Sequence, residues 1–223
     1  MIPRHDGSLL PGSDGEHELQ EKYGTAKRAG AFYDKQVLDR LNAPMREFIA
    51  EQEMFFVATS DSKGECDSSL RSGPAGFVHC LDERTLIYPE YRGNGVMASL
   101  GNISENPHVG IFFVDFFRST IGLHVNGGAR IVENADLPTE FSLPREVERQ
   151  LVERGGRAPE RWVCVAVEEA YIHCSKHIPR LQRLDKEIHW GTDDERQKGG
   201  NYFRVREPRA TDSNHPQTHG PQS

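Results

Sequence analysis

Short β-rich runs separated by turn residues fill the middle of the chain, and this alternation constrains the fold more than any other feature. The series starts at Met54 with MFFVATS, and the turn sequence DSKG follows at residues 61–64. Runs bounded by Gly, Pro, Asn, Asp and Ser in this way are typical of a β meander. We predict six or seven strands, at residues 54–60, 66–72, 76–80, 85–89, 109–116, 121–133 and 161–173.

The run WVCVAVEEAYI, which starts at Trp162, has apolar residues at both odd and even positions of its first half. Successive side chains of a strand point to opposite faces, so this strand is expected to be buried on both faces. An antiparallel barrel buries a strand in this way when a helix or a partner subunit covers its outer face. We therefore predict a mainly β fold, a β-barrel with flanking helices, rather than an open sheet.

The segment before the first strand has helical spacing. Val37, Leu38 and Leu41 share one helical face, and Asn42 and Pro44 then interrupt the pattern. Two short helices are predicted, with Asn42 as the N-cap of the second and Pro44 in its first turn. Proline is tolerated there because an N–H in the first turn has no partner within the helix.

Two further helices are predicted within the series of strands. Met97, Leu100 and Ile103 recur at helical spacing until Pro107 stops the pattern. The second helix is predicted at residues 144–154, where a pair of glycines ends it.

Composition and charge bound the class of protein. The length of 223 residues suits one domain, which we place at residues 25–206, between a flexible extension at 1–24 and a disordered tail at 207–223. No apolar run approaches the roughly 18 residues that span a bilayer, and the N-terminus has no signal-peptide core. We expect a cytoplasmic protein with no membrane partner. The net charge of −7 argues against nucleic acid as a partner.

The cysteines and histidines form no metal motif. The cysteines lie far apart without a C-x-x-C pair, which favours reduced thiols at Cys66, Cys80, Cys164 and Cys174. The histidines near the two ends are expected to be solvated, namely His5, His17, His215 and His219. His173 and His177 have the spacing of zinc ligands on a helix, but His173 closes a strand, so no metal site is predicted.

Three stretches between residues 68 and 130 are the most informative. They read RSGPAGFVHCLDERTLIYPEYRGN, SLGNISENPHVGIFF and GLHVNGGARIV. Together they resemble the pyridoxamine 5'-phosphate oxidase-like flavin proteins, in which such segments form a split barrel and its flavin phosphate site. The resemblance covers roughly residues 50–190. It implies an FMN-binding split barrel, a small-molecule substrate, and a homodimer with each flavin between two barrels.

Cationic and hydroxyl side chains occur where the resemblance places the flavin phosphate. Arg71 ends a strand, Arg92 and Asn94 precede a helix, and Ser99 lies in that helix, whose N-terminus adds a positive end. Alternatively, the arginines are surface charges and Asn94 is only an N-cap. The family usually has basic residues early in this helix, where this chain has GVM at 95–97. That departure leaves room for a deazaflavin or for haem.

The flavin ring is expected beside two other segments. Small residues before Phe77, among them Gly76, would let a planar ring approach the backbone, although an ordinary loop with a bulge explains them equally well. The HCSKH segment resembles one that relatives place near the flavin, which implies that Lys176 donates to the ring oxygens. Trp190 either walls the ring or packs in the core or an interface. The cofactor residues that the resemblance further implies are Ser69, Tyr88 and His173.

Two interpretations from the residues themselves concern Cys174 and the apolar run at 109–116. Cys174 is interpreted as a small buried hydrophobe rather than a nucleophile, because no base is placed to activate it. The run at 109–116 is assigned to the core and to a dimer interface, and the run at 162–167 also exceeds what one small barrel needs inside.

These observations favour an FMN-binding oxidoreductase in which the flavin carries hydride and no side chain is required as acid or base. We therefore name no catalytic residue. The alternatives are a non-catalytic protein that stores or senses a flavin or haem, and a reductase that uses the deazaflavin F420.

Overall fold

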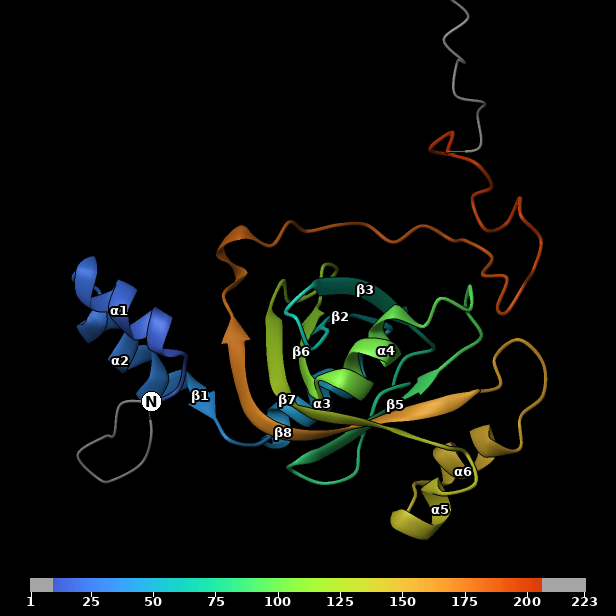
Figure 1. Cartoon of the computed structure of the whole chain (residues 1–223), viewed down its shortest axis with the longest axis horizontal. Coiled ribbons are helices and arrows are strands. Elements are labelled where there is room, and N and C mark those ends of the chain that lie inside the picture. The colour runs from blue at the N-terminus through green and yellow to red at the C-terminus, as the bar shows by residue number, and fades with distance from the viewer. Residues whose placement is uncertain (1–9, 206–223) are drawn as a thin grey trace, which may run out of the picture.

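The computed structural model describes residues 10–205 and is built on one antiparallel sheet of eight strands that curls around a core, with helices at its flanks (Figure 1). The strands pair in the order β3-β2-β6-β7-β8-β5-β4, and β1 pairs with β8. Among residues 10–205, β3 and β4 end this path and do not pair with each other, so the barrel is split. The strands are β1 (Val37–Leu38), β2 (Met54–Ser60), β3 (Cys66–Ser72), β4 (His79–Cys80), β5 (Thr85–Glu90), β6 (His108–Val114), β7 (Gly122–Val132) and β8 (Arg161–His173).

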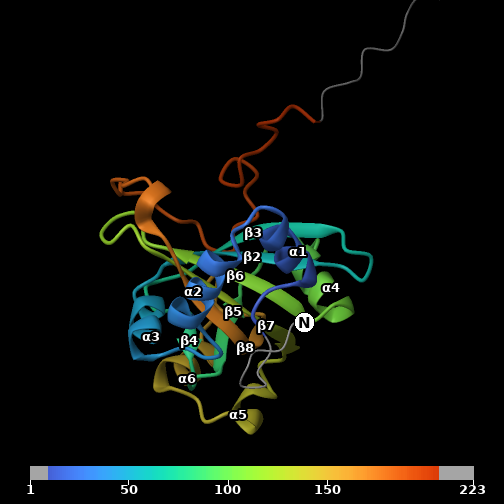
Figure 2. The same cartoon turned by 90° about the vertical axis from the view of Figure 1, so that its left-hand side faces the viewer.

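The predicted mainly β split-barrel fold is confirmed, and each of the seven predicted strands has a counterpart, although β4 covers only the last two residues of the strand predicted at 76–80. The predicted helices at 94–107 and 144–154 are α4 (Ala98–Glu105) and α6 (Arg145–Leu151). A short helix, α5 (Leu137–Glu140), precedes α6, and the two lie together at one end of the molecule (Figures 1 and 2). Within residues 10–205, no helix is both long enough and apolar enough to cross a membrane.

Alternation along β2 builds the main core. Phe55 and Val57 are buried, whereas Phe56 between them is exposed. Phe55 lies opposite Phe113 on β6, and its ring stacks on Phe77 at a centroid distance of 5.6 Å. Side chains that point to this face of β2 therefore fill the barrel, and those on the other face point outward.

Strand β8 is buried on both faces, as its sequence predicts. Val163 and Val165 belong to the main core, while Trp162 and Cys164 belong to a second cluster with the α5 and α6 residues Leu137 and Val147. Helices of the same chain thus cover the outer face at the start of β8. The apolar excess at 162–167 is accounted for within one chain and no longer argues for a dimer.

The N-terminal region differs from the prediction. Val37 and Leu38 form β1 rather than a helix, because their backbones pair with β8 opposite Tyr171 and Ala170. The first helical unit is instead a pair, α1 (Asp14–Lys22) and α2 (Ala26–Gln36), which projects from one side of the barrel in Figure 1. The second predicted helix is confirmed as α3 (Ala43–Ala50). The Oδ1 atom of Asn42 caps it by accepting from the Met45 N–H at 3.0 Å.

The prediction that the histidines near the ends are solvated is wrong for His17. This side chain is buried beside the ring of Tyr33, 6.2 Å away between centroids, because α1 and α2 pack together. His5, His215 and His219 lie outside the described residues, and so does the predicted tail at 207–223.

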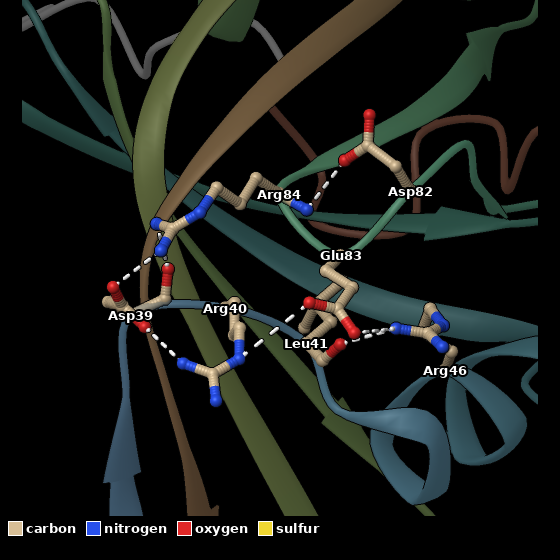
Figure 3. Close-up of polar contacts among 7 residues, drawn as sticks. All are labelled: Asp39, Arg40, Leu41, Arg46, Asp82, Glu83 and Arg84. Carbon is tan, nitrogen blue, oxygen red and sulfur yellow. Dashed lines mark hydrogen bonds and ion pairs between the residues drawn. The ribbon is translucent and has the colours of Figure 1, made fainter.

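Polar contacts join the segment between β1 and α3 to the turn between β4 and β5 (Figure 3). Arg84 forms an ion pair with Asp39 at 2.6 Å, and Glu83 lies 3.6 Å from Arg46. Exposed pairs of this kind contribute about 0–1 kcal/mol each. The backbone N–H of Leu41 also donates to the Glu83 carbonyl at 2.7 Å, and the Leu41 side chain is fully buried. This buried leucine is the stronger anchor of the segment.

Candidate functional site

The main candidate site is a pocket of about 760 Å³ at the split of the barrel, between β3, the loop from β5 to α4, the start of β8 and the C-terminal segment. On β3, Asp67, Ser69 and Arg71 are half-buried and alternate with exposed neighbours, so all three point to the face that also carries the core. The sequence-predicted residues that line this pocket are Ser69, Arg71, Arg92, Asn94, Ser99 and Trp190.

A chain of hydrogen bonds crosses the floor of the pocket. Arg71 donates from Nε to Glu90 Oε1 at 2.7 Å and from Nη1 to Ser69 Oγ at 2.8 Å. The Ser69 and Ser99 hydroxyls are 2.9 Å apart, and Ser99 Oγ donates to Asp67 Oδ2 at 3.1 Å. Arg71 can only donate and an ionised carboxylate can only accept. The proton of Ser69 is therefore directed to Ser99, and that of Ser99 to Asp67.

This direction gives the two serines the character of acceptors. Each hydroxyl proton is used inside the chain of hydrogen bonds, so the pocket meets an oxygen lone pair at Ser69 and at Ser99. Ser99 was expected to donate to a phosphate. In this structure its proton goes to Asp67 instead, so that role stays a prediction. Arg71 keeps Nη2 without a hydrogen-bond partner among residues 10–205.

The start of α4 adds backbone donors. The N-cap position is Met97 in the left-handed conformation, with φ of 57°, and its side chain makes no capping bond. The first amides of a helix, here from Ala98 onward, have no acceptor within the helix. Asn94 does not cap α4: its Oδ1 accepts from the Val96 N–H at 2.9 Å and so shapes the loop before the helix.

The C-terminal segment at residues 178–205, which we call the strap, runs past the barrel (Figure 1). Its residues between Trp190 and Lys198 line one side of the pocket. Asp193 on the strap forms an ion pair with Arg92 at 2.7 Å. The ring of Trp190 meets the ring of Tyr91 edge-on at 5.3 Å. Burial raises the pKa of Tyr91 to about 12, and the nearby Glu153 carboxylate adds to the shift. Tyr91 therefore remains a neutral phenol at neutral pH.

The strap packs directly against the main body at Gly156. A Cβ added to Gly156 would lie 1.9 Å from the carbonyl oxygen of Trp190, a distance that real Cβ atoms do not show. Glycine is therefore required at this position while the strap keeps its place. Gly191 makes the reciprocal contact in the left-handed region, with φ of 63°.

Two predicted residues line a different pocket. Gly76 and Phe77 contribute to a space of about 680 Å³ that is closed by α6. Phe77 is buried, and its ring lies so close to Gly73 that a Cβ there would clash at 2.3 Å. The Phe77 ring therefore explains why residue 73 is a glycine, and no flavin ring is needed to explain it.

Tyr88 belongs to the core and does not line the main pocket. Its side chain is fully buried against Phe55, with ring centroids 5.0 Å apart. Burial raises the pKa of its hydroxyl, which has no hydrogen-bond partner among residues 10–205. Its predicted contact with a cofactor would require the cofactor to enter the barrel interior.

His173 and Lys176 lie at the other end of β8. Arg161 begins that strand in the pocket, and His173 ends it twelve residues later, roughly 40 Å along the strand at 3.3 Å per residue. His173 Nδ1 lies 3.0 Å from His124 Nε2. Lys176 is exposed in a short 3₁₀ turn. Cys174 is also exposed, so the interpretation of Cys174 as a buried hydrophobe is wrong. Within one chain these residues do not line the pocket.

The family model described as pyridoxamine 5'-phosphate oxidase matches residues 41–174, more than half of the chain. The chain belongs to the pyridoxamine 5'-phosphate oxidase family. The matched span runs from Leu41 to Cys174 and takes in β2 to β8, and thus every strand around the pocket.

Several solved structures are similar to this family member at low identity. HupZ from Group A Streptococcus is 23% identical, with a TM-score of 0.43, 64% of this chain covered and 99% of that chain. A putative pyridoxamine 5'-phosphate oxidase from Lactobacillus delbrueckii is 18% identical, with a TM-score of 0.43 and coverage of 61% and 98%. HutZ from Vibrio cholerae, described as a heme storage protein, is 15% identical, with a TM-score of 0.37 and coverage of 60% and 94%. A search of curated proteins found no match.

FMN, which the family implies, fits the pocket in size and in donors. The volume lies within the range of about 300–1,000 Å³ that small-molecule sites occupy. Arg71 Nη2 and the first amides of α4 are available to a phosphate. The charges, however, balance: four cations face four carboxylates, at Arg71, Arg92, Arg161 and Lys198 against Asp67, Glu90, Glu160 and Asp193. A phosphate is attracted less strongly here than in a purely basic site.

Sequence reasoning missed these carboxylates. Asp67 could have been found, because it precedes Ser69 and Arg71 by two and four residues on one predicted strand, a spacing that places all three on one face. Asp193 gave no such signal, because it reaches Arg92 over 101 residues of sequence. Within residues 10–205, no group of three or more His, Cys, Asp or Glu residues is placed to hold a metal ion.

Proposed function

We propose that the protein binds flavin mononucleotide in the pocket at the split of the barrel and acts as an oxidoreductase on a small molecule. The observation that carries the proposal is the convergence of Arg71 with the first turn of α4 at one end of this pocket. When bound, FMN supplies the hydride chemistry. The side chains of this protein then have to bind, orient and shield the cofactor.

The phosphate is proposed to accept from Arg71 Nη2 and from the first amides of α4. Glu90 holds the Arg71 guanidinium in place from its other edge, because the pair is mostly buried and 2.7 Å apart. The acceptor oxygens of Ser69 and Ser99 suit the hydroxyl groups of the ribityl chain. Tyr91 and Trp190 provide an aromatic wall that excludes water from one side.

We further propose a homodimer in which a partner brings its His173 and Lys176 segment to the pocket. An exposed row of side chains supports it, since Phe56 lies opposite both Leu70 and Phe112, and Phe112 lies opposite His124. This row crosses four neighbouring strands on the outward face, with Leu70 53% exposed and Phe56 37% exposed. Exposed apolar patches of this kind mark contact surfaces.

Two measurements test the assembly. Sedimentation should give a dimer at micromolar concentration, and a monomer would overturn the shared site. Lys176→Met should lower the midpoint potential of bound FMN while affinity for oxidised FMN changes only a few-fold, because a cation stabilises the charge that reduction places on the ring. Identical midpoints in the two proteins would remove Lys176 from the site.

The function itself is tested first by the absorption spectrum of the purified protein and by titration of apoprotein with FMN. FMN binding with reduction by NADH or NADPH under anaerobic conditions would support the oxidoreductase. Binding without turnover would favour a storage or sensing protein. A deazaflavin or haem spectrum would overturn the assignment of FMN. The GVM sequence at 95–97, where the family usually has basic residues, is the observation that leaves room for these two cofactors.

A further inference from the structure

The hydrogen-bond chain on the pocket floor has a second consequence, which concerns the charge of the ligand. Asp67 receives the proton of Ser99, and that leaves Ser99 and Ser69 facing the pocket as acceptors. Ser99 lines the pocket but is only 4% exposed, so its hydroxyl has few partners other than those in this chain of hydrogen bonds. The end of the pocket nearest α4 therefore presents two acceptor oxygens backed by a carboxylate.

A phosphate monoester matches these two serine oxygens poorly, although Arg71 Nη2 and the first amides of α4 remain available to it. It carries a charge of about −1.5 to −2 at neutral pH, and its oxygens are strong acceptors. At Ser99 it would meet an oxygen whose proton is already used, and it would lie near the negative charge of Asp67. A ligand group with hydroxyl or N–H donors makes hydrogen bonds with both serines without disturbing the chain.

We propose that Asp67 is a specificity-determining residue that weakens the binding of the dianionic phosphate of FMN beside Arg71 and α4, so that the pocket prefers FMN over the uncharged riboflavin only slightly. This proposal rests on the proposed function, that is, on flavin binding in this pocket. It predicts that the wild-type protein prefers FMN over riboflavin much less than a basic phosphate site would. Asp67 acts through Ser99 and through its charge, not through contact with the reacting part of the flavin.

The decisive variant is Asp67→Asn, which keeps the shape of the side chain and removes its charge. Fluorescence titrations of apoprotein with FMN and with riboflavin would be compared in wild type and variant. The dissociation constant for FMN should fall by roughly tenfold, because one like charge near the phosphate is gone, whereas that for riboflavin should stay within about twofold.

Glu65→Gln is the matched control. It removes the same charge two residues away, where Glu65 is exposed on the turn between β2 and β3 and does not line the pocket. An equal gain in FMN affinity from Glu65→Gln would overturn the proposal, since it would show an effect of net charge alone. Equal changes for FMN and riboflavin in Asp67→Asn, or weaker FMN binding, would overturn it as well and leave the proposed function standing.

A readout without flavin separates the two ideas. Inorganic phosphate should raise the unfolding temperature of Asp67→Asn more than that of wild type, while sodium chloride at the same ionic strength should not. If neither protein binds any flavin, the proposed function fails, and this phosphate measurement still decides whether Asp67 repels anions. If Asp67→Asn does not fold, Asp67→Ser provides the second test: it removes the same charge and keeps a hydroxyl oxygen, so it should also bind FMN about tenfold more tightly than wild type with riboflavin binding unchanged, and an unchanged FMN affinity would contradict the proposal.

Discussion

Gly156→Ala should release the strap from the wall of the pocket without changing a residue that lines the pocket. The new methyl group would lie 1.9 Å from the Trp190 carbonyl oxygen and 2.6 Å from its carbon, and both neighbours are backbone atoms. Backbone cannot rotate away as a flexible side chain can. The strap therefore has to move outward by more than an ångström, and Trp190 moves with it.

The magnitude follows from the contacts that this movement breaks. The Arg92–Asp193 pair is 57% and 65% exposed at its two side chains, so it contributes about 0–1 kcal/mol. The edge-on contact of Tyr91 with Trp190 contributes about 0.5–1.5 kcal/mol. Strap docking should weaken by about 1–2 kcal/mol, a factor of roughly 5–30 in the ratio of docked to released strap. The main core contributes nothing to this sum and should unfold at nearly the same temperature.

Tryptophan fluorescence reads the movement directly. The chain has two tryptophans, and Trp162 is fully buried, so quenching by iodide reports on Trp190. In Gly156→Ala, emission should shift to the red and quenching should increase. The control is Gly93→Ala, because a Cβ at Gly93 meets nothing within 4 Å. Unchanged quenching in Gly156→Ala would refute the reasoning that the contact at Gly156 holds the strap.

Three further outcomes are expected. Arg71→Ala should weaken FMN binding by roughly ten- to hundredfold in calorimetric titration, because a charge-assisted hydrogen bond of about 1.5–3 kcal/mol is lost, and unchanged affinity would move the phosphate elsewhere. A thiol reagent at pH 8 should label the exposed Cys66 and Cys174 quickly and Cys80 slowly, because burial raises the pKa of Cys80 to about 12; equal rates would contradict its burial. Burial opposes ionisation of Asp115, but hydrogen bonds from the loop that follows it outweigh burial and lower its pKa to about 2. Its carboxylate therefore stabilises the fold above pH 4 and loses this effect as pH falls toward 2. Denaturant titration of Asp115→Asn should show the largest loss of stability at neutral pH and a smaller loss in acid.

The fold could be predicted because its signals are local. Alternation and turn residues mark each strand from β2 to β8, and side-chain spacing alone places Asn42 as the cap of α3. β1 could not be predicted in this way. It has only two residues, and what makes them a strand is a partner on β8, more than 130 positions further along the chain.

The same contrast between local and distant signals applies to the candidate site. Arg71 was predicted at a strand end, Ser99 in a helix and Ser69 from the family resemblance, and the structure brings all three together. The carboxylates that fix their hydrogen bonds were missed, because reasoning about a phosphate directs attention to cations. The distance of Lys176 from the pocket depends on the length of β8. The five-residue HCSKH segment carries no information about that length.

The charged residues of β3 have one more effect, on how copies of this protein meet. Within residues 10–205, β3 pairs only with β2, so its other side offers free backbone groups to any strand of another molecule. Charged side chains that point inward from an edge strand hinder such additions, and on β3 these are Asp67 and Arg71. Replacing these charges with apolar side chains, for example to fit a more hydrophobic ligand, would therefore also expose the edge of the sheet to pairing with other molecules. Such variants should be screened for aggregation before a loss of activity is assigned to the pocket.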